Sequence, residues 1–312
     1  MSGSFVDSSL AIPLLVAVFG IPGQIVWSYC VGGAVFGIGL VTILLRGDWQ
    51  RSQGFDKLIL FGPIFYAAPL AAFGTEHFTI TSDIASIVPS WIPWHLFWAY
   101  FVGACFIAAA LSMATGIQAR LAASLVALTF FLFVALMDAP GWVQTPRDRF
   151  AAALTLRELS FSGGALALAA GLSAQQSERA ARIFAMIARY FIAVPVLFYS
   201  FEQFRHADHV PGLPLELVTP HYVIGHAVWT YLVAAVYVVA GIPLLIGWRT
   251  RAAAAWIGLS VLVVEIAVYV PIAVMERADF EGINYLGDTL MYCGAVLLLA
   301  GAMPRETQQR EH

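Results

Sequence analysis

Charged residues are scarce in this chain. Of its 312 residues, 11% are charged and 60% are hydrophobic, and the mean hydropathy is +0.81. Typical soluble domains contain about 25% charged residues and about 45–50% apolar residues. So few charges cannot cover the surface of a soluble fold, whereas a bilayer accepts apolar side chains that face outward. The composition therefore predicts an integral membrane protein with the lipid bilayer as its main partner.

Basic clusters are also missing. The formal net charge is −3, and Lys and Arg occur singly or in pairs. Proteins that bind nucleic acid concentrate positive charge in patches, so we exclude nucleic acid as a partner. The first basic residue is Arg46, and the apolar N-terminus thus lacks the positively charged start of a cleavable signal peptide. We expect the N-terminus to stay on the mature protein.

Paired thiols are the third absence. Cys30, Cys105 and Cys293 lie singly inside apolar runs, with no C-x-x-C spacing. This pattern excludes a dithiol oxidoreductase, because that chemistry needs two neighbouring thiols. We expect these cysteines to act as small apolar residues.

Long apolar segments are abundant. A crossing helix needs about 20 apolar residues. Nine segments meet this expectation, at about 24–45, 58–75, 95–114, 121–138, 157–173, 183–202, 223–246, 252–272 and 284–303. They predict an all-α polytopic membrane protein with about nine transmembrane helices. Residues 9–20 precede a break at Gly20, Pro22 and Gly23, and we expect an interfacial or re-entrant segment there, with a tenth crossing as the alternative.

The basic residues of the short loops predict the orientation. With segment 46–57 inside, ten basic residues lie inside and five outside. The inner set is Arg46, Arg51, Lys57, Arg120, Arg179, Arg182, Arg249, Arg251, Arg305 and Arg310, and the outer set is Arg147, Arg149, Arg157, Arg205 and Arg277. We expect a multi-pass protein of the inner (plasma) membrane with a cytoplasmic C-terminus.

The two halves of the chain match each other. An offset of 126 residues aligns Pro69 with Pro195 and Glu76 with Glu202. At offsets of 131 and then 130, further matches are His95 with His226, Trp98 with Trp229, Gly116 with Gly247, Arg120 with Arg251, Glu158 with Asp288 and Gly164 with Gly294. Matches at uncommon residue types along four consecutive helices predict an internal duplication.

The duplication predicts the domain organisation. We expect an N-terminal apolar segment and first transmembrane helix at 1–50, one four-helix unit at 58–173, a second at 183–303 and a cytoplasmic tail at 304–312. Because each unit contains an even number of crossings, both units enter the membrane from the same side. This parallel arrangement argues against inverted-repeat transporters and leaves parallel-repeat transporters open.

Two short motifs occur in both units. The first helix ends in Thr75-Glu76-His77-Phe78 or Phe201-Glu202-Gln203-Phe204, and small residues with an Arg follow the second helix at 116–123 and 247–254. With these motifs the chain resembles, over about 58–303, the DoxX-like bacterial membrane proteins in a duplicated form. The resemblance implies a subunit linked to thiosulfate:quinone oxidoreductase or another membrane redox complex, with a quinone and a soluble or membrane redox partner. The second half has Gln203 where the first has His77, so the resemblance supports no role that needs this His in both units.

Polar residues gather at the predicted outer ends of the helices. They are Glu76, His95, Asp138 and Glu158 in unit one, and Glu202, His226 and Asp288 in unit two. They could line an outer pocket that exchanges protons. The alternative is that water and headgroups solvate them as ordinary helix ends, and a duplication copies such ends as faithfully as functional groups.

Glu265 is the most distinctive candidate. It lies inside a predicted helix, and the residue aligned with it in unit one is Val134. An acidic group at the bilayer centre costs about 2.5–3.5 kcal/mol, so such residues face a bundle interior or a wet cavity. We expect Glu265 to point into unit two, with His226 as the first-choice partner. It would either exchange protons or bridge two helices as a neutral acid.

The loop at 202–226 is rich in potential metal ligands. It contains Glu202, His206, Asp208, His209, His221 and His226, but their spacing fits no defined metal motif. We therefore predict no metal site, and the residues demand no bound cofactor.

Three function classes follow from these patterns. They are a quinone- or redox-linked membrane subunit, a small-solute or proton-coupled transporter, and a non-catalytic assembly or stress scaffold. The sequence alone does not decide whether the protein is an enzyme.

Overall fold

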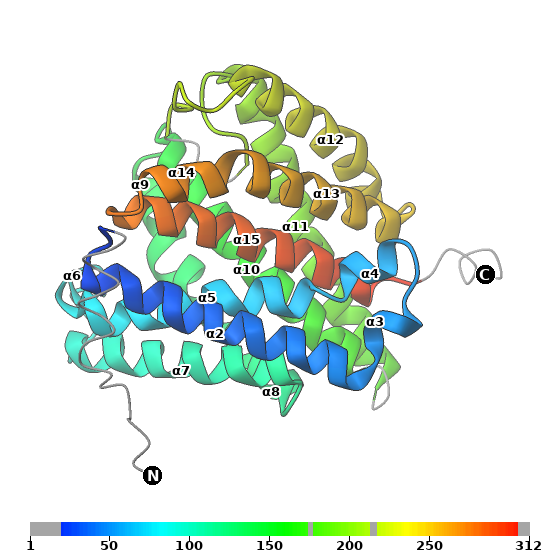
Figure 1. The fold of residues 1–312 in the computed structure, drawn as a ribbon, viewed down its shortest axis with the longest axis horizontal. Coiled ribbons are helices and arrows are strands. Elements are labelled where there is room, and N and C mark those ends of the chain that lie inside the picture. The colour runs from blue at the N-terminus through cyan, green and yellow to red at the C-terminus, as the bar shows by residue number, and fades with distance from the viewer. Residues whose placement is uncertain (1–19, 174–176, 213–216, 305–312) are drawn as a thin grey trace, which may run out of the picture.

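The computed structural model describes residues 20–173, 177–212 and 217–304. Within these ranges the chain is almost entirely helical, and the β pairing is limited to one isolated bridge between His209 and Val218 (Figure 1). The expected N-terminal segment at 9–20 and the tail lie almost wholly outside the described residues. The all-α prediction is confirmed.

Nine long helical segments form the bundle, and shorter helices extend or connect them. The described helices are α2 (Gly23–Arg46), α3 (Asp48–Arg51), α4 (Phe55–Ile59), α5 (Gly62–Thr79), α6 (Thr81–Ser86), α7 (His95–Thr115), α8 (Ala119–Phe133), η1 (Val134–Asp138), α9 (Ala139–Gln144), α10 (Arg149–Ser173), α11 (Glu178–Arg205), α12 (His226–Ile246), α13 (Thr250–Val264), η2 (Glu265–Tyr269), α14 (Val270–Met275) and α15 (Phe280–Ala302).

Eight of the described segments are long and apolar enough to cross a membrane. They are Gly23–Arg46, Phe55–Thr79, His95–Thr115, Ala119–Gln144, Glu178–Arg205, Ala227–Ile246, Thr250–Met275 and Phe280–Ala302. The chain is thus a polytopic membrane protein. Two of the eight segments continue through a short π-helix, η1 after α8 and η2 after α13.

The remaining long helix, α10, differs from its prediction. It has 25 residues and begins at Arg149, eight positions before the expected start at 157. Its first half includes Arg149, Arg157 and Glu158, and it is therefore absent from the eight apolar segments. Helices α8, α11 and α15 pack against it. Because protein covers α10, its polar groups need not face lipid.

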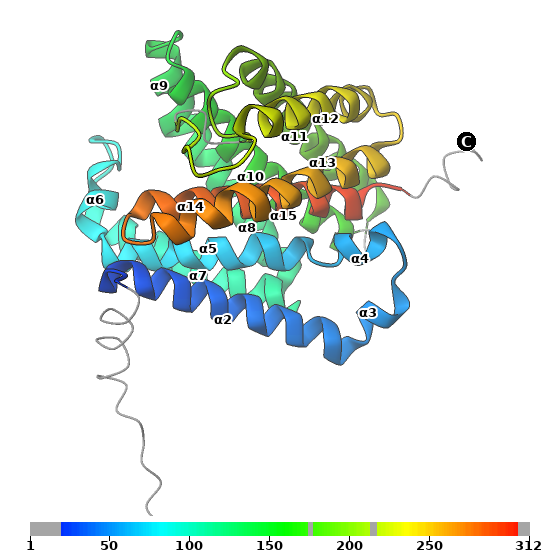
Figure 2. The same cartoon turned by 45° about the horizontal axis from the view of Figure 1, so that its top comes forward.

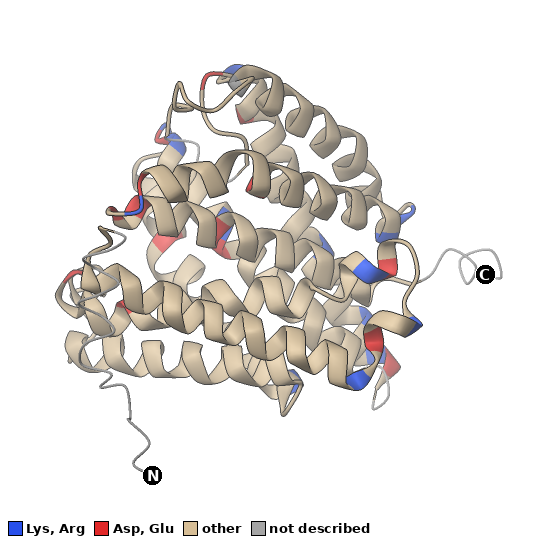
Figure 3. Ribbon diagram, viewed as in Figure 1, with Lys and Arg blue, Asp and Glu red and all other residues tan. Residues whose placement is uncertain are grey.

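Charges gather at the two ends of the long helices (Figure 3). Figures 1 and 2 place α3, α4 and the last turn of α15 at one end, called the α4 end below. Helices α6, α9 and α14 lie at the other, called the α9 end. Most of the length between the two ends lacks charge, as the apolar core of a bilayer requires.

Element bounds recur at the offset found in the sequence. Helices α7 and α12 both have 21 residues, and their first residues, His95 and His226, lie 131 positions apart. Helices α8 and α13 both have 15 residues, and the π-helices η1 and η2 follow them at the same offset. A duplicated origin and the superposition of the two units stay predictions.

The centre of the bundle is packed through glycines. A Cβ on Gly164 of α10 would collide with Ala295 of α15, and one on Gly294 of α15 would collide with the backbone of Tyr66 on α5. Such contacts need the absence of a side chain, because they let helix backbones approach closely. Helix α15 therefore lies directly against both α5 and α10.

Candidate functional site

A partly buried ion pair joins α10 to α15. The guanidinium of Arg157 donates from Nη1 to Oδ2 of Asp288 at 2.5 Å and from Nη2 to Oε1 of Glu158 at 3.2 Å. The Arg157 side chain is 24% exposed, and that of Asp288 is 9% exposed. Arg157 and Asp288 each lie eight residues after the first residue of their helix, about 12 Å along its axis. The pair therefore lies inside the bundle, towards the α9 end.

Two more carboxyl groups belong to the same set. Asp138 of η1 interacts electrostatically with Arg157 and Glu158, and Glu76 of α5 interacts with Asp288. One oxygen each of Glu76, Asp138 and Glu158 is buried without a hydrogen-bond partner in the part of the chain that the structure describes. These five residues form the Arg157 cluster.

Negative groups outnumber positive ones in the Arg157 cluster. Four carboxyl groups and one guanidinium interact electrostatically, and they come from α5, η1, α10 and α15; Asp288 and Glu158 contact Arg157 directly. Placing several ionised carboxylates in an apolar interior with a single cation is very unfavourable, whereas neutral carboxyl groups are tolerated. The cluster is therefore suited to hold and release protons.

Glu202 forms a second ion pair, apart from the first. Nε of Arg149 donates to Oε2 of Glu202 at 2.9 Å, and Nε2 of His206 lies 3.8 Å from the same oxygen. Glu202 is 7% exposed near the C-terminal end of α11. The structure thus places Glu202 beside the loop that follows α11.

Glu265 is buried in the interior of the helix bundle. Glu265 is 4% exposed, and both carboxyl oxygens have no hydrogen-bond partner among the described residues. It interacts electrostatically with Tyr269 and with Cys293 of α15. The hydroxyls of Tyr237 and Tyr292 are likewise buried without a partner in the described ranges. Three polar groups, with four oxygen atoms, therefore lie in this part of the core without a hydrogen-bond partner among the described residues.

The two expected histidines begin corresponding helices. His95 is the first residue of α7, half-buried, and within the described chain it forms no hydrogen bond or ion pair. His226 is the first residue of α12, and its side chain lies outside the described residues. The predicted contact between Glu265 and His226 therefore stays a prediction.

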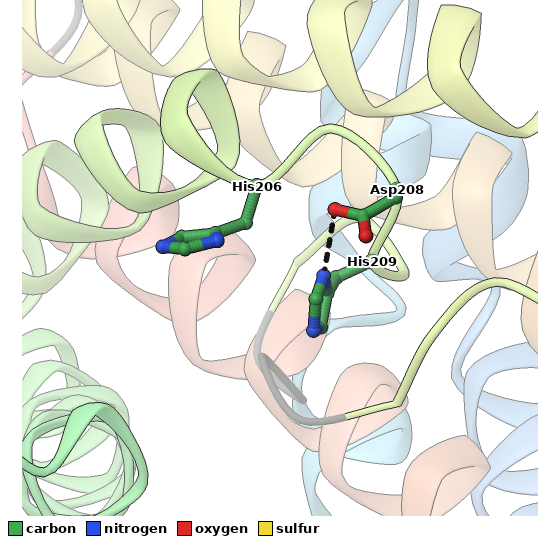
Figure 4. Close-up of side chains that lie close together, drawn as sticks. All are labelled: His206, Asp208 and His209. Atoms are coloured by element: carbon green, nitrogen blue, oxygen red, sulfur yellow. Dashed lines mark hydrogen bonds and ion pairs between the residues drawn. The ribbon is translucent and has the colours of Figure 1, made fainter.

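The loop after α11 brings three potential ligands together. The ligand atoms of His206, Asp208 and His209 all lie within 4.8 Å of one another (Figure 4). Nδ1 of His209 and Oδ1 of Asp208 are 2.9 Å apart. Desolvation, with the positive charge of Arg149, lowers the pKa of His206, and the hydrogen bond with His209 lowers the pKa of Asp208. Neutral imidazole and ionised carboxylate are the forms that bind metal ions.

A cavity of about 400 Å³ lies at the α4 end of the bundle. Apolar residues of α2, α5, α7, α10 and α15 form most of its wall, and Thr42, Arg46 and Asp48 supply polar groups. This volume lies within the usual range of ligand sites, about 300–1,000 Å³. The cavity fits a molecule with an apolar body and one polar end.

Sequence reasoning collected the acids of the Arg157 cluster but missed its cation. The apolar pattern places Arg157 at a loop boundary, because the predicted helix begins at 157. The sequence just before that position could have shown the longer helix. Residues 149–156 read Arg-Phe-Ala-Ala-Ala-Leu-Thr-Leu, and the alanines and leucines favour helix.

The architecture and the cluster define an all-α polytopic membrane protein with an ionisable interior. No family model, curated protein or solved structure matches this chain.

Proposed function

We propose that this integral membrane protein exchanges protons at the Arg157 cluster and couples the exchange to the movement of a small solute. The observation that carries the proposal is the excess of carboxyl groups, two buried and two partly buried, around one guanidinium. Ionisable residues inside membrane proteins mark ion pathways and proton relays, because their energetic cost is otherwise uncompensated. The cluster draws its residues from both expected units, as ligand sites of repeat transporters do.

Charge displacement after a pH step tests this proposal without an identified solute. Full-length protein in vesicles adsorbed on a solid-supported membrane should give a transient current that protein-free vesicles lack. Replacing Glu76 by Gln or Asp138 by Asn should remove most of the current, because an amide cannot exchange a proton. Neither residue bonds directly to Arg157, so both variants should keep the ion pair with Asp288. The exposed acids Glu281 and Asp83 provide matched controls, as Glu281→Gln and Asp83→Asn, and both should retain it. A current that is absent in the wild type, or unchanged in both cluster variants, would refute proton exchange.

A second candidate is a quinone-linked redox subunit, and the cavity at the α4 end favours it. The DoxX-like resemblance implies a quinone, whose apolar body and polar ring oxygens suit the cavity wall and Arg46. In this function the protein would bind the quinone in the plasma membrane, and a separate redox partner would exchange electrons with it.

Gly171 allows a direct test of the quinone candidate. It lines the cavity, and a Cβ built there meets no atom within 4 Å, so a larger side chain would enter the cavity. Protein purified in mild detergent should contain quinone detectable by mass spectrometry, and Gly171→Leu should lower that content about tenfold. Gly33→Leu, on the exposed face of α2, is the matched control. A wild-type preparation free of quinone, together with no binding of a short-chain ubiquinone, excludes this candidate, and failure of both candidates would favour a scaffold.

A further inference from the structure

We infer that His206, Asp208 and His209 form a binding site for a divalent transition-metal ion, with Zn²⁺ as the best fit. The ligand atoms of the three side chains lie within 4.8 Å of one another at the end of α11, where Asp208 and His209 are hydrogen-bonded and the His206 ring would have to turn towards them (Figure 4). This inference is independent of proton exchange, because none of the three residues belongs to the Arg157 cluster.

The distances require only small side-chain movements. In a tetrahedral zinc site with bonds of about 2.1 Å, two ligand atoms are about 3.4 Å apart. The observed maximum is 4.8 Å, and Nδ1 of His209 lies 2.9 Å from Oδ1 of Asp208. An ion placed between these two atoms would replace their shared proton, widen the pair by roughly half an ångström and draw in His206. Side chains that are 32%, 69% and 17% exposed, for His206, Asp208 and His209 in turn, can make that adjustment.

The backbone of the site is already fixed. The amide of Val210 donates to the carbonyl of Leu217, and that of Thr219 donates to the carbonyl of Asp208, both at 2.9 Å. Oγ1 of Thr230 donates to the carbonyl of His209 at 3.0 Å, which ties the loop to α12. Binding would therefore order few further dihedral angles, and a site that is fixed before binding loses less entropy on binding.

The ligand types select the ion. Two imidazoles and one carboxylate suit Zn²⁺, Co²⁺, Ni²⁺ or Cu²⁺, whereas Ca²⁺ and Mg²⁺ prefer sites made of oxygen. Three protein ligands leave one tetrahedral position for water. Oε2 of Glu202 lies 3.8 Å from Nε2 of His206, and a small movement of the ring on metal binding would form the hydrogen bond by which outer carboxylates orient histidines in zinc sites.

Zinc titration of the intact protein tests the inference. Full-length protein, purified without a polyhistidine tag and treated with chelator, should bind one Zn²⁺ by isothermal titration calorimetry. Removing an outer-shell residue costs about 10–100-fold in affinity, so the double change His206→Ala and His209→Ala should cost at least as much. His221→Ala removes an exposed histidine of the same segment from outside the triad, and it should bind as the wild type does.

Two further measurements keep the test decisive. Asp208→Asn changes an exposed side chain and should weaken zinc binding at least about tenfold while leaving thermal unfolding of the metal-free protein unchanged. Cobalt added in place of zinc should give the visible absorption of a four-coordinate complex in the wild type and in His221→Ala, and the double variant should lack it. Unchanged zinc affinity in both the double and the Asp208→Asn variants, or an equal loss in His221→Ala, would overturn the site.

Discussion

Arg157 and Asp288 lie 131 positions apart in the sequence and 2.5 Å apart at their closest atoms. One residue belongs to α10 and the other to α15, so their ion pair connects the two predicted four-helix units. It does so inside the bundle, where a charge without a partner is expensive. The bond therefore holds the units together and fixes the charge balance of the Arg157 cluster.

Replacing Arg157 by Met should strongly destabilise the protein. Removing one partner of a buried pair costs about 3–5 kcal/mol, because the other charge remains. Thermal unfolding in detergent should show a clear decrease, and the double change Arg157→Met with Asp288→Leu should recover part of it. Asp48→Asn is the control, since Asp48 pairs with Arg51 at the exposed α4 end. An Arg157→Met protein as stable as the wild type would contradict a structural role for the pair.

Replacing Gly164 by Ala should separate α10 from α15. The added Cβ would overlap Ala295, and overpacking of a tight core costs about 1–3 kcal/mol. Gly171→Ala is the matched control on the same helix, because its Cβ meets no atom within 4 Å. That control should be neutral or slightly stabilising, since Ala favours helix over Gly. Equal thermal unfolding of the two variants would show that the close contact is absent.

Replacing Glu265 by Gln should leave folding intact and reduce the pH-step current. Both carboxyl oxygens lack a hydrogen-bond partner among the described residues, so the amide loses no bond, and we expect a change in unfolding free energy below about 1 kcal/mol. An amide cannot exchange a proton at neutral pH, so any part that Glu265 has in the current should disappear. Glu281→Gln is the control. An unchanged current would assign Glu265 to structure alone.

Tyr222 should titrate at unusually high pH. Its hydroxyl donates to Oε1 of Glu276 at 2.9 Å, and desolvation, with this bonded carboxylate, raises the pKa of Tyr222 from 10.0 to about 12. Its contribution to stability is therefore complete below pH 10.0 and is lost as the pH rises through about 12. The tyrosinate absorbance of the wild type minus that of Tyr222→Phe should show one step near pH 12. A step near pH 10 would mean that the hydrogen bond does not form in solution.

The C-terminus should be cytoplasmic. Ten loop residues with positive charge lie on the side of the C-terminus and five on the other side, and cytoplasmic loops of membrane proteins carry an excess of Lys and Arg. Alkaline phosphatase fused after His312 should be inactive, and green fluorescent protein fused there should fluoresce. Active phosphatase in the periplasm would reverse the assigned orientation.

The apolar pattern predicted most helices closely, and charged residues explain the main error. The expected crossings at 95–114 and 223–246 correspond to α7 and α12 within about three residues. The predicted start of α10, at 157, lies too far along the chain, because Arg157 and Glu158 interrupt the apolar run of this helix. Pairing with α15 permits these charges inside the bundle, and no local pattern reveals a partner that lies 131 residues away.

The sequence predicts which acidic residues lie at the helix ends, but it does not predict which of them come together in one site. The acids at the helix ends follow from hydropathy and from the matched halves, but their convergence depends on how α5, η1, α10 and α15 pack. The loop triad of His206, Asp208 and His209 fits no spacing motif, since the turn after α11 and the pairing of 208–210 with 217–219 bring it together. Tertiary contacts determine both features.

The glycine contacts among α5, α10 and α15 limit how this protein can move. Parallel-repeat transporters expose their site alternately to each side by rocking one half against the other. Here that motion would have to part helices whose backbones already touch, and packed interfaces of this kind change between discrete arrangements instead of deforming gradually. The three central helices would then act as a stationary axis, and opening towards either side of the membrane would fall to helices outside this central contact.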